Sequence, residues 1–94
     1  MDDRRTRHRA VVREVLDVLN RYDLSALGPG EEDGPPYDEY LNEALPIASA
    51  LLNRGSIEHS DVSRVWLEWF GDDLSALPKT TWTRLLRDLN AILE

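Results

Sequence analysis

The sequence predicts an all-α fold, a small four-helix bundle with a long loop rich in glycine, proline and acidic residues between the first and second helices. Two observations predict it. Apolar residues recur with a period of about 3.6 in four separate segments, and no segment shows the alternation typical of a half-buried strand. The chain of 94 residues is also the size of one small domain, so we assign residues 1–94 to a single helical domain.

The first helix is expected at residues 4–21, where an apolar stripe faces the core. Asp2 or Asp3 can cap its N-terminus. The stripe consists of Val11, Val15, Val18 and Tyr22, with Val12, Leu16 and Leu19 beside it.

Residues 23–41 break the helical pattern, because Gly28-Pro29-Gly30 and Gly34-Pro35-Pro36 cannot sustain a regular element. The second helix is expected at residues 42–54. Pro46 can then sit in or next to its first turn, and Gly55 ends it in a left-handed conformation.

The third helix is expected at residues 60–70, with Ser60 or Ser56 as its cap and Gly71 at its end. The fourth is expected at residues 80–93, starting at Thr80 or Thr81. The two apolar stripes are Val62, Val65, Trp66, Trp69 and Phe70, and Trp82, Leu85, Leu86, Leu89, Ile92 and Leu93.

Four aromatic residues gather in these two helices: Trp66, Trp69, Phe70 and Trp82. We expect them to lie mainly in the core. A domain this small cannot easily bury three tryptophans completely, so one of them is left to line a groove or an interface.

A short internal repeat is also present. Asp-Leu-Ser-Ala-Leu occurs at residues 23–27 and again at 73–77, each time directly after a helix. We favour a shared turn, in which an aspartate caps a short helical turn and leucines fix the loop to the core. The alternative is a duplication, but the residues around the two copies do not match.

Charge is distributed unevenly along the chain. The formal net charge is −7, which disfavours nucleic acid as a partner. The first 13 residues contain five arginines, whereas residues 14–43 contain nine acidic residues and the single base Arg21. There is no cysteine, no apolar run long enough for a membrane helix and no secretory signal at the N-terminus, so we expect a cytoplasmic protein that does not enter membranes.

The sequence shows no apparatus for catalysis, and we expect neither an enzyme nor a cofactor or metal site. His59 lies near Ser56, Ser60 and Asp61, but adjacent residues at a helix start cannot converge as nucleophile, base and orienting acid. The acids around Glu31 lack the spacing of a calcium-binding loop.

Several short motifs are similar to those of a known family. They are Arg21-Tyr22-Asp23, Tyr37-Asp38-Glu39-Tyr40, Ala44-Leu45-Pro46-Ile47 and Leu51-Leu52-Asn53-Arg54-Gly55. Together they resemble the YugE-like family of small, mostly uncharacterised bacterial helical proteins over residues 20–71. The chain departs from the family pattern at Leu24 and Leu41, where proline and aspartate are usual. The resemblance implies an all-α fold and carries no catalytic residues.

The strongly acidic middle segment and the surplus of aromatic residues favour a protein that binds another protein. One concrete form is an immunity or antitoxin protein that masks a basic toxin. The expected partner-binding residues are Glu31, Glu32, Asp33, Tyr37, Asp38, Glu39 and Tyr40. The alternatives are a small nucleic-acid-associated regulator that uses the arginine-rich N-terminus, residues 4–13, and a structural homodimer.

Overall fold

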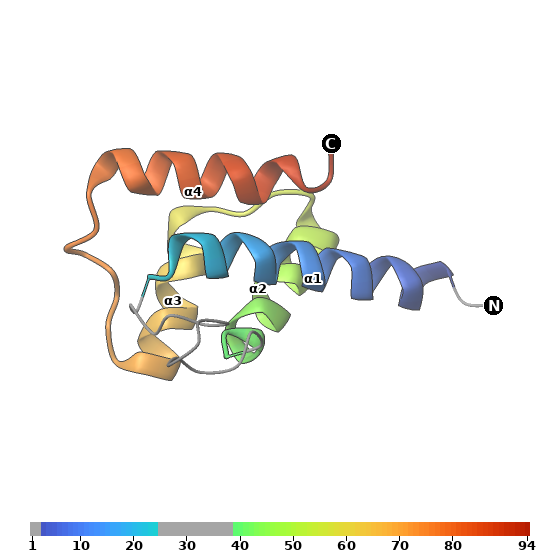
Figure 1. The fold of residues 1–94 in the computed structure, drawn as a ribbon, viewed down its shortest axis with the longest axis horizontal. Coiled ribbons are helices and arrows are strands. Elements are labelled where there is room, and N and C mark those ends of the chain that lie inside the picture. Colours follow the sequence, from blue (N-terminus) through green and yellow to red (C-terminus); the bar gives the residue numbers. More distant parts are fainter. Residues whose placement is uncertain (1–2, 25–38) are drawn as a thin grey trace.

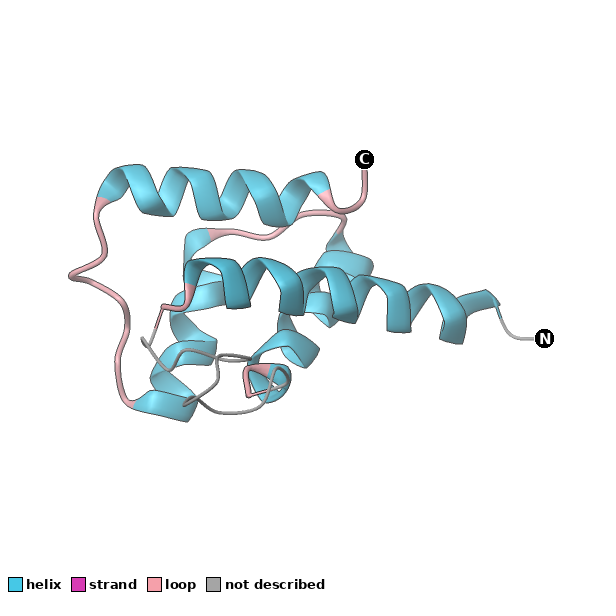
Figure 2. Ribbon diagram, viewed as in Figure 1, coloured by secondary structure: helices cyan, strands magenta, loops and turns pink. Residues whose placement is uncertain are grey.

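The computed structural model describes residues 3–24 and 39–94, and within them it confirms the all-α, four-helix fold. The helices are α1 (Asp3–Tyr22), α2 (Leu41–Arg54), α3 (His59–Phe70) and α4 (Lys79–Ala91). The described part of the ribbon contains only helices and loops (Figure 2). Most of the predicted glycine- and proline-rich loop, residues 25–38, lies outside the described residues.

Helix α1 is the centre of the arrangement. It packs against both α2 and α4, and α2 in turn packs against α3. Figure 1 shows α1 and α4 running side by side in opposite directions, with the first turns of α1 extending beyond the other helices. This position explains why Arg7 and Arg9 are exposed, whereas burial on α1 begins at Val11.

One continuous core joins the four helices, and the predicted stripes supply most of it. Its fully buried large side chains are Val15, Leu19, Tyr40, Ile47, Leu51, Val62, Trp66, Leu85 and Leu89. Leu86, Ile92 and Leu93 of the predicted fourth stripe pack against this core while only partly buried. No helix in the described ranges combines the length and the apolar character needed to span a bilayer.

The C-terminal ends of α2 and α3 lie where the sequence predicts them. Gly55 and Gly71 adopt left-handed backbone conformations, with φ of 80° and 70°. Their N–H groups donate to the carbonyls of Leu51 and Leu67, at 2.7 and 3.0 Å. Glycine takes this conformation without the steric cost that a Cβ imposes, so both helices end at a glycine.

The predicted N-terminal caps were wrong at α3. The cap residue is Glu58, neither Ser56 nor Ser60. Its N–H donates to the Asp61 carboxylate at 2.7 Å, which gives half of a capping box. Asp61 also pairs with Arg54 at the end of α2, so one carboxylate fixes the start of α3 to the preceding helix.

Pro46 lies deeper in its helix than the sequence analysis places it. Because α2 begins at Leu41, Pro46 is inside the helix, in its second turn. A proline there removes one backbone donor, the one that would face the carbonyl of Asn42. Asn42 is exposed, so water can satisfy that carbonyl.

The connector between α3 and α4 contains the second copy of the repeated pentapeptide. Residues 25–27 of the first copy lie outside the described residues, and the positive φ falls on Asp23 in the first copy but on Leu74 in the second, so the shared turn stays a prediction. Asp73 accepts a hydrogen bond from the Ser75 N–H at 2.9 Å, and the Leu77 N–H donates to the Leu74 carbonyl at 3.0 Å. Leu74 is buried and has a positive φ of 63°. The Trp82 indole N–H donates to the Leu74 carbonyl at 3.3 Å, which fixes this strained residue to α4.

Candidate protein-interaction surface

Most of the predicted partner-binding residues cannot be placed. Glu31, Glu32, Asp33, Tyr37 and Asp38 all lie outside the described residues. The remaining two have different positions: Glu39 is exposed, whereas Tyr40 is completely buried. The expectation that Tyr40 faces a partner therefore does not fit the structure.

Tyr40 instead joins three elements from inside the core. Its hydroxyl donates to the Asp23 carboxylate just after α1, with the oxygens 2.5 Å apart. Its ring centre lies 5.7 Å from that of Trp66 and 6.4 Å from that of Phe70, both on α3. Tyr40 thus fixes the start of α2, and with it the exposed Glu39, close to the C-terminal end of α3.

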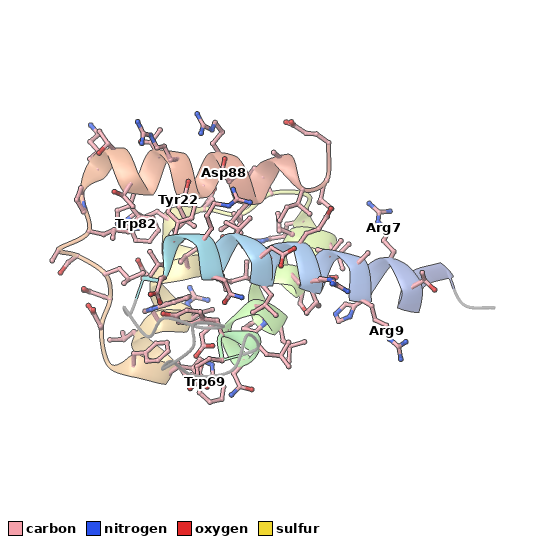
Figure 3. The ribbon with its side chains drawn as sticks, viewed as in Figure 1. Arg7, Arg9, Tyr22, Trp69, Trp82 and Asp88 are labelled. Carbon is pink, nitrogen blue, oxygen red and sulfur yellow. The ribbon has the colours of Figure 1, made fainter. Side chains whose placement is uncertain are left out.

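That end of α3 carries three large apolar side chains that are partly exposed. Leu67 is 55% exposed, Trp69 50% and Phe70 38%. Exposed acidic side chains surround them in sequence: Glu68, Asp72 and Asp73. We call these six residues, Leu67, Glu68, Trp69, Phe70, Asp72 and Asp73, the α3-end surface. Figure 3 shows Trp69 at the opposite edge of the molecule from Asp88 on α4.

The structure divides the three tryptophans between two environments. Trp66 and Trp82 belong to the core, whereas Trp69 is half exposed. The expectation that one tryptophan is left at the surface is confirmed. Phe70 is also partly outside the core, although it packs on Trp66 with ring centres 5.5 Å apart.

Two acids of the α3-end surface accept backbone hydrogen bonds in the connector: Asp72 from the Leu74 N–H and Asp73 from the Ser75 N–H, both at 2.9 Å. The backbone N–H of Ser75 donates to Asp73 and lowers the pKa of its carboxyl below the ordinary value. Asp72 and Asp73 thus help to form the connector, and with Glu68 they leave exposed carboxylates beside the apolar side chains.

Three of the arginines near the start of the chain have described side chains. Arg7, Arg9 and Arg13 are all exposed on α1. Figure 3 shows Arg7 and Arg9 projecting from opposite sides of the helix. Arg7 therefore lies on a different face of α1 from Arg9.

A second polar cluster joins α1 to α4. The Tyr22 hydroxyl donates to the Asp88 carboxylate at 2.6 Å, and Arg21 and Arg87 lie 3.7 and 3.5 Å from the same carboxylate. The hydrogen bond from Tyr22 lowers the pKa of Asp88, while desolvation and the nearby carboxylate raise the pKa of Tyr22. The four side chains mainly satisfy one another, so the cluster is a contact between helices.

His59 is exposed at the start of α3. Its ring stacks on Trp82 of α4, with the ring centres 3.8 Å apart. Ser63 Oγ lies 3.4 Å from His59 Nδ1, and this serine is not one of those considered from the sequence. In the described part of the chain, no group of three or more histidine, aspartate or glutamate side chains is placed to hold a metal ion.

Sequence reasoning missed the α3-end surface as a site, although one signal for it was available. Leu67 lies outside the apolar stripe of its helix, and an apolar residue on the polar face of a short helix indicates an exposed contact.

Comparison with known proteins adds no assignment. No protein-family model matches the chain, and neither a curated protein nor a solved structure matches it. The resemblance of residues 20–71 to the YugE-like family therefore stays a prediction.

Proposed function

We propose that this chain is a non-enzymatic protein-binding protein that recognises a basic partner protein through the α3-end surface. The observation that carries the proposal is the exposure of Leu67, Trp69 and Phe70 at one end of one helix, beside three exposed acids. Leu67 and Trp69 project from different sides of the helix end, with Phe70 between them. Large exposed apolar side chains are typical of recognition sites, and tryptophan is enriched among residues that dominate binding energy.

The chemistry of this surface favours a cationic partner. An arginine or lysine of the partner can lie over the Trp69 ring and pair with a neighbouring carboxylate such as Glu68. Glu39, which is also exposed, directly precedes Tyr40, whose buried ring packs against Phe70. The net charge of −7 speeds the encounter with a basic protein at low salt. Masking of a basic toxin by an immunity or antitoxin protein is the form of this function that we favour.

The predicted loop acids take part in the proposal as steering charges. Changing Glu31, Glu32 and Asp33 to their amides is expected to slow association and to flatten its salt dependence, while dissociation changes less. A variant that associates at the wild-type rate would restrict the interface to the α3-end surface.

The test is quantitative capture of basic proteins from the native lysate at low salt, with three baits compared side by side. These are the wild type, Trp69→Ala, and the double variant Glu14→Gln/Asp17→Asn as the control. The control removes two exposed acids from α1, away from the α3-end surface. We expect one basic protein to be captured by the wild type and the control and to be lost with Trp69→Ala.

Two results would overturn the proposal. One is a basic protein captured equally well by all three baits, because the α3-end surface would then play no part. The other is a concentration-dependent dimer in sedimentation that Trp69→Ala dissociates. That result would assign the surface to a structural homodimer, the alternative from the sequence.

A further inference from the structure

A groove between α1 and α2 combines an apolar floor with a basic rim. It has a volume of about 450 Å³ and is lined by Arg9, Val12, Arg13, Leu16, Leu41 and Leu45. Val12 and Leu16 are buried and form the floor, whereas Leu45 is 41% exposed. Arg9 and Arg13 are both exposed.

The spacing of these residues sets a regular repeat along the groove. Arg9 and Arg13 are four residues apart on α1, which is about 6 Å along a helix axis. Leu41 and Leu45 have the same separation on α2. Val12 and Leu16, the apolar floor, have this separation on α1 too, whereas α2 crosses α1 (Figure 1). A helical partner laid along α1 presents its own side chains with the same period, so it can meet the arginine pair and the apolar floor together.

The positive charge of Arg9 and Arg13 indicates which side chains a helix bound in the groove would present to them. We infer that this groove binds an amphipathic helical segment of a partner protein that places leucine-like side chains over Val12 and Leu16 and acidic side chains against Arg9 and Arg13. Burial of the exposed part of Leu45 supplies the apolar gain, and the two guanidinium groups select carboxylates.

The negative net charge of the chain does not prevent the groove from binding an acidic segment. At physiological ionic strength, charges separated by more than about 8 Å are largely screened, so the two arginines at the rim dominate what a bound segment meets. The groove is also a poor site for nucleic acid, because phosphates would leave the apolar floor unused. The groove is independent of the α3-end surface, which lies on α3.

The experiment measures binding of two labelled amphipathic peptides by fluorescence anisotropy, using the full chain. Each is about 16 residues long, because shorter helices form poorly in water. Both carry the same leucine stripe, and one has glutamate and the other lysine beside it. We expect the wild type to bind the glutamate peptide at least tenfold more tightly than the lysine peptide.

Variants then assign the binding to the groove. Leu45→Glu should weaken binding of the glutamate peptide at least tenfold, and Arg9→Glu/Arg13→Glu should reverse the preference in favour of the lysine peptide. The control Arg84→Glu changes an exposed arginine on α4 and should leave binding unchanged. Trp69→Ala should also leave it unchanged, so failure here and failure of the α3-end surface are distinguishable. Circular dichroism confirms that each variant is folded.

Three results would overturn the inference: equal binding of the two peptides, full binding by Leu45→Glu, or tighter binding of a duplex DNA of matched length with the same dependence on Arg9 and Arg13. The last result would instead support the nucleic-acid alternative.

Discussion

The contrast between Trp66 and Trp69 gives the sharpest test of the fold. Both lie on the predicted apolar stripe of α3, three residues apart. Trp66 is fully buried and packs on Tyr40 and Phe70, whereas Trp69 is 50% exposed. Truncation to alanine should therefore have very different effects at the two positions, although the residue type and the helix are the same.

The magnitudes follow from burial. Trp66→Ala removes a whole buried indole and leaves a cavity, which costs about 3–5 kcal/mol. Trp69→Ala removes a side chain that water already reaches, so it opens no closed cavity. About half of the transfer free energy of a large apolar side chain is lost, or roughly 1–1.5 kcal/mol. Domains of this size often have only about 5–15 kcal/mol in total, so Trp66→Ala should be close to unfolding.

The assay is urea unfolding followed by far-ultraviolet circular dichroism, which does not depend on which tryptophan remains. In thermal unfolding, Trp66→Ala should lower Tm by more than about 12 °C and Trp69→Ala by roughly half of that or less. Trp66→Phe is the control, since it retains most of the buried ring and should fall between them. Equal destabilisation by the two alanine variants would show that Trp69 is packed between helices, and would refute the exposed α3-end surface.

Three further predictions concern polar groups. Glu43 is buried, and burial raises the pKa of its carboxyl, so the folded state favours the neutral carboxyl. The free energy of unfolding should therefore be greatest below the pKa that Glu43 has in the unfolded chain. It should fall as the pH rises through the higher pKa that Glu43 has in the folded protein. Glu43→Met removes the buried carboxyl and should therefore stabilise the protein by about 1–3 kcal/mol at pH 7. The urea midpoint of this variant should no longer fall as the pH rises above 4.5, and a fall as large as that of the wild type would contradict the prediction. Asn90 accepts from the Ile57 N–H at 2.8 Å and donates to the Ile57 carbonyl at 3.1 Å, so Asn90→Asp should cost about 1–3 kcal/mol in urea unfolding, and an unchanged midpoint would argue against this clamp. Tyr22→Phe should cost about 0.5–1.5 kcal/mol and raise the pKa of Asp88, measurable by NMR titration; a constant pKa would mean that Tyr22 does not hold that carboxylate.

Local chemistry made the helices and their C-terminal ends predictable. Gly55 and Gly71 end α2 and α3 because glycine tolerates the positive φ that a helix end requires. The N-terminal ends were less predictable, since several polar residues compete for one cap. At α3, Asp61 resolves this competition by accepting from the Glu58 N–H, and that contact depends on where the preceding helix places Arg54.

Contacts between helices could not be predicted, because they depend on how the helices pack. Asn90 reaches Ile57 across 33 residues of sequence, and His59 stacks on Trp82 of another helix. The burial of Tyr40 has the same origin. The acidic residues Asp38 and Glu39 precede it in sequence, and its contacts with Asp23 and Trp66 place it in the core.

The candidate surface follows from a limit of helical periodicity. A stripe with a period of about 3.6 fixes the direction in which a side chain points, but not whether another helix extends far enough to cover it. Val62, Val65 and Trp66 point inward and are buried. Trp69 continues the same stripe by less than one turn, next to Phe70, where the helix ends, and is half exposed. Where an apolar stripe extends beyond the helices that bury it, large side chains stay in contact with water and lower the solubility of the protein. The exposed acids Glu68, Asp72 and Asp73 offset this loss of solubility. The same acids would favour a positively charged partner over any other at this end of α3.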